Sequence, residues 1–115
     1  MAFNGDDEHI NIPHVNDFNI AEGALAMWVN VPDIDFSNVD DSIHDGQAIF
    51  SKDSRNTDNG GKHLTLWVND NGSVRVRHQT SGENEIQTSS GLINEDQWHH
   101  IMYTWGSDGK RLYID

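Results

Sequence analysis

The feature that most constrains the fold is a pair of alternating apolar runs within residues 63–77 that meet at Asp70-Asn71-Gly72. Turn residues between two alternating runs predict a β-hairpin. A two-residue loop would place Leu66 opposite an arginine, whereas a three-residue loop places it opposite Val76. The three-residue loop also suits a type I turn closed by a left-handed glycine. The sequence therefore predicts the three-residue loop.

This register sorts the hairpin side chains onto two unlike faces, because successive residues of a strand point to opposite sides. One face is apolar and is predicted to enter the core: Leu64, Leu66, Val68, Val74 and Val76. The other face is polar with a single tryptophan at its centre: Thr65, Trp67, Asn69, Arg75, Arg77 and Gln79.

Four further stretches have the two-residue period of strands, at residues 10–12, 24–32, 48–52 and 86–88, and the chain ends in a second hairpin. Its apolar residues line up across a loop at 106–109: Ile101, Tyr103 and Trp105 with Leu112 and Ile114. The run at 24–32, with Trp28 and alanines on its second face, is expected to be a central strand. The indoles at Trp28, Trp98 and Trp105 are assigned to packing. Short strands without a 3.6-residue period predict an all-β antiparallel sandwich or jelly roll.

The chain has 115 residues, which is one domain or less. Its charge argues against two classes of partner, nucleic acid and anionic membranes. It has 7 Lys and Arg against 19 Asp and Glu, a formal net charge of -12. Such a charge opposes binding to nucleic acid or to anionic membranes. No Cys is present, so neither redox compartment is excluded. No signal peptide or membrane span is visible, so either the protein is intracellular or an export segment lies outside this sequence.

The order and spacing of the strand segments resemble the laminin G-like, concanavalin A-like lectin-glucanase jelly-roll family over nearly the whole chain. The matching stretches are FNGDDEHINIP at 3–13, ALAMWVNVP at 24–32, AIFSKD at 48–53, LTLWVNDNGSVRVR at 64–77 and DQWHHIMYTWGSDGKRLYID at 96–115. The resemblance implies one laminin G-like β-sandwich domain over residues 1–115. Family members normally continue past the equivalent of residues 112–115. We therefore expect a truncated chain, a split half, or a protomer completed by self-association with another copy.

The resemblance also implies a calcium site at the rim of the sandwich, as in many family members. Asp6 and Asp7 in the opening turn are the predicted ligands, and the loop carboxylates Asp53 and Asp58 come second. Calcium takes six to eight oxygen ligands, which acidic loops can supply. The sequence contains no D-x-D-x-D-G calcium loop, so a solvated acidic loop is the alternative. The histidines lack the spacing of zinc ligands, and His99 and His100 are expected to be framework residues.

The polar face of the first hairpin is the predicted ligand site. Trp67 lies across from Arg75, and Thr65 lies across from Arg77. Sugars bind by stacking an apolar ring face on an aromatic ring and by hydrogen bonds to planar polar groups. Two arginines on one face of an acidic protein make a local positive patch, which favours an acidic glycan. Alternatively, Trp67 packs under a neighbouring strand or under further C-terminal strands.

Catalysis is not expected, although some enzymes share this jelly roll. Glycosidases of the family carry E-x-D-x-x-E on one strand, and this motif does not occur in the sequence. The sequence predicts a non-catalytic recognition module of a larger extracellular or surface protein that binds glycan or a protein surface, with calcium assistance. The alternatives are a structural domain of a virion fibre, adhesin or oligomer without a small ligand, and, more remotely, a fragment of a glycoside-active enzyme. Neither nucleic acid nor membrane insertion is expected.

Overall fold

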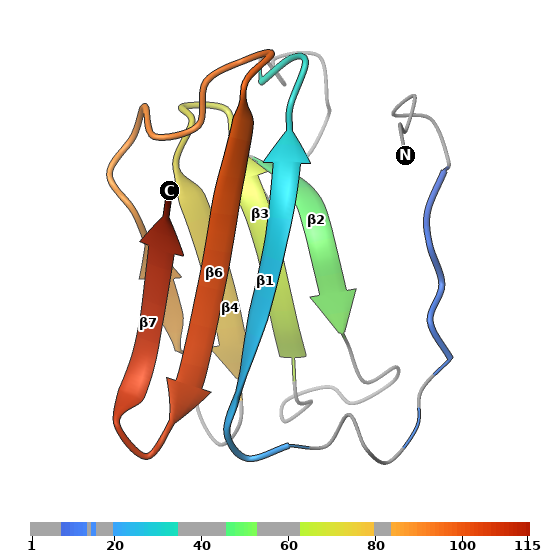
Figure 1. The fold of residues 1–115 in the computed structure, drawn as a ribbon, viewed down its shortest axis with the longest axis vertical. Helices are drawn as coiled ribbons and strands as arrows, with labels where there is room; N and C mark the ends of the chain where they lie inside the picture. The colour runs from blue at the N-terminus through green and yellow to red at the C-terminus, as the bar shows by residue number, and fades with distance from the viewer. Residues whose placement is uncertain (1–7, 14, 16–19, 35–45, 53–62, 80–83) are drawn as a thin grey trace.

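A computed structural model describes residues 8–13, 15, 20–34, 46–52, 63–79 and 84–115. The strands among them form two antiparallel sheets packed face to face (Figure 1). The strands are β1 (Gly23–Asn30), β2 (Gly46–Lys52), β3 (His63–Asn69), β4 (Val74–Gln79), β5 (Glu85–Gln87), β6 (Trp98–Gly106) and β7 (Gly109–Ile114). One sheet has the order β1-β6-β7 and the other β2-β3-β4-β5. The described ranges contain no helix, and therefore no helix that is long and apolar enough to cross a membrane. The predicted all-β antiparallel sandwich is confirmed.

The first hairpin has the register that its apolar pattern predicts. Leu66 pairs with Val76, and Val68 pairs with Val74. The amide of Asn69 donates to the carbonyl of Ser73 at 2.9 Å, which closes the three-residue loop. Gly72 has a φ of 71°, the left-handed conformation that this turn requires.

The core lies between the sheets and is built from alternate residues of both. Its buried apolar side chains are Val31, Leu64, Leu66, Val68, Val74, Val76, Ile93, Ile101 and Tyr103. The second hairpin also keeps its predicted register, with Ile101 opposite Ile114 and Tyr103 opposite Leu112. Gly106 pairs with Gly109, so the unpaired part of the predicted loop is only two residues long.

Two predictions about strands are wrong. Residues 10–12 form no strand, and Ile10 and Ile12 expose 61% and 65% of their surface. In Figure 1 this blue segment runs outside the sandwich on the side of β2, and none of the described strands pairs with it. An alternating pattern gives a strand only where a neighbouring backbone supplies hydrogen bonds. β1 is not central: within the described part of the chain it forms an edge of the three-stranded sheet.

Candidate functional site

The structure brings together the four predicted ligand-binding residues, which we call the arginine site: Thr65, Trp67, Arg75 and Arg77. They lie on the outer face of the four-stranded sheet, where Trp67 pairs with Arg75 and Thr65 with Arg77. The guanidinium carbon of Arg75 lies 5.0 Å from the centroid of the Trp67 ring. This distance is within the range of a cation–π contact.

The polar groups of the arginine site are bonded to neighbours in the same sheet. Arg75 donates to both carboxylate oxygens of Glu85, with its Nη2 at 2.8 Å from each. The hydroxyls of Thr65 and Ser51 lie 3.3 Å apart. Trp67 exposes only 4% of its surface, so its ring is not open to a sugar in this conformation. An anionic ligand would have to replace Glu85 at Arg75.

A close approach of backbone helps to bury Trp67. Gly46 pairs with Asn69 on the adjacent strand. A Cβ atom at Gly46 would lie 2.6 Å from Cδ1 of Trp67 and 2.5 Å from the carbonyl oxygen of Val68. Only glycine therefore leaves room for the indole at this edge of the sheet.

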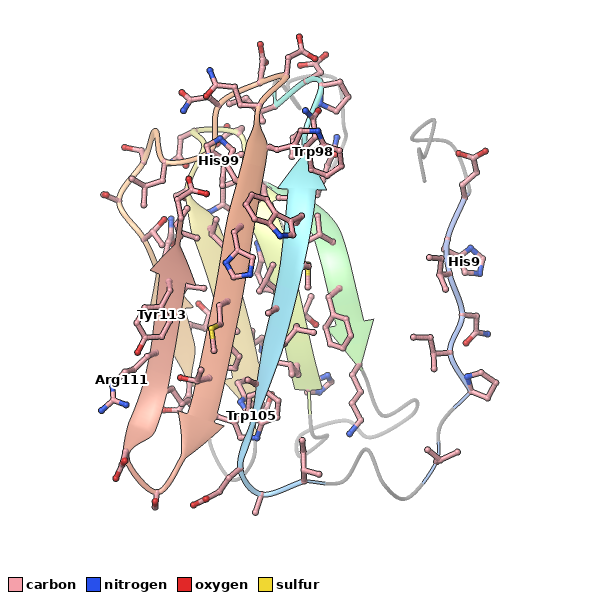
Figure 2. The ribbon with its side chains drawn as sticks, viewed as in Figure 1. His9, Trp98, His99, Trp105, Arg111 and Tyr113 are labelled. Carbon is pink, nitrogen blue, oxygen red and sulfur yellow. The ribbon has the colours of Figure 1, made fainter. Side chains whose placement is uncertain are left out.

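Among the described residues, the aromatic side chains that expose most of their surface lie on the other side of the molecule, on the outer face of the three-stranded sheet. We call it the aromatic face: Trp28, Trp98, His100, Met102 and Tyr113. Trp28, Trp98 and Tyr113 expose 65%, 64% and 49% of their surface. Figure 2 shows Trp98 at the start of β6 and Tyr113 projecting from β7. The assignment of Trp28 and Trp98 to packing is therefore wrong within the described residues.

The strand register sets the geometry of the aromatic face. Trp28 pairs with His100, and their ring centroids lie 5.1 Å apart at an interplanar angle of 52°. Trp98 pairs with Asn30, which places it diagonally next to Trp28, about 7–8 Å away between Cα atoms. The sequence did contain this signal, since alternation places Trp28 on the side of β1 opposite the residues that face the core.

The upper end of the three-stranded sheet is held by Asp115, which follows β7. Its carboxylate accepts hydrogen bonds from the backbone amide of His100 at 2.8 Å and from Nδ1 of His99 at 2.7 Å. These bonds lower the pKa of Asp115 below its ordinary value, the His100 amide contributing most. Nε2 of the buried His99 accepts from the amide of Asn94, which leaves Nδ1 as the nitrogen that donates to Asp115. His99 through its ring and His100 through its backbone amide thus both hold Asp115 at the end of β7, which confirms them as framework residues.

A polar cluster joins the two sheets near the lower end of the sandwich, where Figure 2 labels Trp105. Nδ1 of His78 lies 2.9 Å from the hydroxyl of Tyr103, and Trp105 stacks on Tyr103 with ring centroids 5.7 Å apart. Lys110 donates to the carbonyl of His78 at 2.9 Å. Burial raises the pKa of Tyr103 to about 12. Stability therefore falls as the pH rises above 10, where the tyrosine of the unfolded chain ionises first.

Acid is expected to destabilise the fold through His78. Burial, followed by the charges of Lys110 and Lys52, lowers the pKa of His78 below its ordinary value of 6.5. Because the unfolded chain then takes up the proton more readily, this stabilisation is present above pH 6.5 and is lost as the pH falls below it. His78→Gln should weaken this pH dependence. The measurement is urea unfolding at about pH 7.5 and about pH 5 for both proteins; an identical loss of stability in the two would contradict the assignment.

The predicted calcium ligands Asp6 and Asp7 lie outside the described residues, as do Asp53 and Asp58. Among the residues that the structure does describe, no three His, Asp or Glu side chains gather as a metal site. The calcium site thus stays a prediction.

Two antiparallel sheets packed face to face make the described part of the chain an all-β sandwich, the architecture of the concanavalin A-like fold. The chain belongs to the concanavalin A-like lectin/glucanases superfamily, since the laminin G family model described by that name matches residues 4–115. Domains of this kind are in general carbohydrate- or protein-binding modules. Neither a curated protein nor a solved structure matches the chain.

Proposed function

We propose that this domain is a non-catalytic recognition module that binds carbohydrate through the aromatic face. The observation that carries the proposal is the exposure of two indoles on adjacent strands, Trp28 at 65% and Trp98 at 64%. Exposed large aromatic rings that gather on one face mark binding surfaces more often than isolated ones do. The apolar faces of sugar rings stack on such indoles and leave their hydroxyls at the edges for hydrogen bonds.

Polar groups border the rings where sugar hydroxyls would lie. Asn30 pairs with Trp98 across the strands, and the side chain of Thr104 shares the same side of β6. The phenol hydroxyl of Tyr113 and the imidazole of His100 can each donate or accept. Stacking rings bordered by such groups are the usual composition of a carbohydrate site.

The arginine site is the second candidate, with an acidic glycan as its ligand. The proximity of Arg75, Arg77 and Trp67 favours it. The bidentate pair between Arg75 and Glu85 and the 4% exposure of Trp67 weigh against it, because both groups must rearrange before a ligand can reach them. We therefore rank this site below the aromatic face.

Isothermal titration with soluble neutral and acidic polysaccharides tests the two candidates together. Trp28→Ala and Trp98→Ala should each weaken binding about tenfold or more, because each removes a stacking ring. Both indoles are exposed, so these variants should keep the wild-type circular dichroism. Arg75→Gln is the matched control and should leave the affinity unchanged. Binding that is lost in Arg75→Gln but kept in Trp28→Ala would move the site to the four-stranded sheet, and no binding to any saccharide would refute the proposal.

We also propose that Asp6 and Asp7 help to bind calcium, and that the domain works at an extracellular or cell surface, where calcium is plentiful. A ligand that binds only the folded state must raise its stability. Millimolar calcium should therefore raise the melting temperature by several degrees over excess chelator. The double variant Asp6→Asn, Asp7→Asn should lose this shift. Equal melting temperatures of the unaltered protein in calcium and in chelator would rule the site out.

A further inference from the structure

The aromatic face has a spacing that bears on the length of its ligand. Trp28 lies opposite His100, and Tyr113 lies opposite Met102, which is the next residue on the same side of β6. Two strand spacings across the sheet and one two-residue step along β6 therefore separate Trp28 from Tyr113. This amounts to about 12 Å between their Cα atoms. The Trp28–Tyr113 line thus crosses all three strands obliquely.

Resting on the proposed function, we infer that the ligand is an extended, uncharged polysaccharide chain that crosses β1, β6 and β7 obliquely and stacks on both Trp28 and Tyr113. This separation between the Cα atoms exceeds the length of one sugar unit, so a monosaccharide stacks on only one of the two rings. A chain that reaches both gains the second stacking contact within the same binding event. Affinity therefore rises with chain length up to the number of units that spans the face.

Charge complementarity points to an uncharged ligand. On the outer side of the three strands only Arg111 carries a formal charge; it lies opposite Thr104, two residues from Tyr113 on the same side of β7. The neighbouring carboxylate of Asp115 is already bonded by His99 and His100. The face is thus nearly neutral on a chain of formal net charge -12.

The same charge disfavours the other occupants of the aromatic face. An acidic polysaccharide meets long-range repulsion from the remainder of the chain, and two copies of a chain with net charge -12 repel each other. A neutral sugar chain experiences neither repulsion. Its hydroxyls instead find donors and acceptors at His100, Thr104 and Tyr113, which share this side of the sheet.

The test is a length series by isothermal titration, with cellohexaose, xylohexaose and mannohexaose each measured against its disaccharide and polygalacturonate as the acidic probe. At least one hexasaccharide should bind about tenfold tighter than its disaccharide, the change that a second stacking contact of about 1.4 kcal/mol produces. Tyr113→Ala should reduce hexasaccharide affinity to the disaccharide level, whereas Tyr113→Phe, which keeps the ring, should preserve the gain.

The outcomes separate this inference from the proposed function. If a disaccharide binds as tightly as its hexasaccharide and Trp28→Ala still weakens both, the carbohydrate site stands but the extended chain does not. Tighter binding of polygalacturonate, or full hexasaccharide affinity in Tyr113→Ala, would also overturn the extended neutral ligand. If no saccharide binds, and light scattering shows a dimer that Trp28→Ala dissociates, a second copy covers the face and both proposals fail.

Discussion

Leu66→Ala is expected to lower the free energy of unfolding by about 2–5 kcal/mol, the range measured for buried leucines in well-packed cores. Leu66 is fully buried between the sheets, opposite Val76 on the neighbouring strand. The substitution removes buried methyl groups and leaves a cavity that the surrounding rigid strands can close only in part. Urea unfolding followed by circular dichroism measures the effect.

The matched control is Thr65→Ala, the preceding residue on the opposite face of β3. Its hydroxyl makes one long contact with Ser51 at 3.3 Å, so the expected cost is below about 1 kcal/mol. The difference between these neighbours comes from the alternation of the strand. Equal costs for the two substitutions would show that the register of the first hairpin is wrong.

Gly72→Ala should be nearly as damaging, at roughly 3–4 kcal/mol, because it combines two separate penalties. Gly72 has a φ of 71°, which an L-residue adopts at a cost. An added Cβ would also lie 2.6 Å from the carbonyl oxygen of Ile93. That loop cannot simply withdraw, because the amides of Leu92 and Ile93 both donate to the carbonyl of Gly72, at 3.1 and 2.9 Å.

Gly91 offers a control for the backbone part of this cost. Its φ of 75° is close to that of Gly72, but an added Cβ would meet no atom within 4 Å. Gly91→Ala should therefore cost only about 1–2 kcal/mol. The two variants can be compared by thermal or urea unfolding. A cost for Gly72→Ala no larger than that for Gly91→Ala would mean that the loop after β5 does not pack against the hairpin turn.

The strands and both hairpin registers could be predicted from the sequence because two-residue periodicity and turn residues determine them locally. Periodicity shows which residues share a face, but it does not show what covers that face. Trp67 and Trp28 illustrate this limit. Both stand on the side of a strand opposite the core, yet Trp67 is buried under Arg75 beside Gly46, whereas Trp28, beside the tilted ring of His100, exposes 65% of its surface.

The same limit explains the segment at Ile10 and Ile12. Its alternation is correct for a strand, but the pairing of a strand depends on a partner that is distant in sequence. The calcium prediction rests on Asp6 and Asp7 and is independent of the described strands. The family, by contrast, could be inferred from order and spacing, because these survive where individual residues change.

The most direct test of binding at the aromatic face is an NMR titration of the indole N–H signals with a soluble neutral hexasaccharide. The chain has 4 tryptophans, two exposed on this face and two, Trp67 and Trp105, elsewhere. The signals of Trp28 and Trp98 should shift together with added sugar, while those of Trp67 and Trp105 stay in place. A shift of Trp67 alone, or of none of the four, would contradict carbohydrate binding at the outer face of the three-stranded sheet.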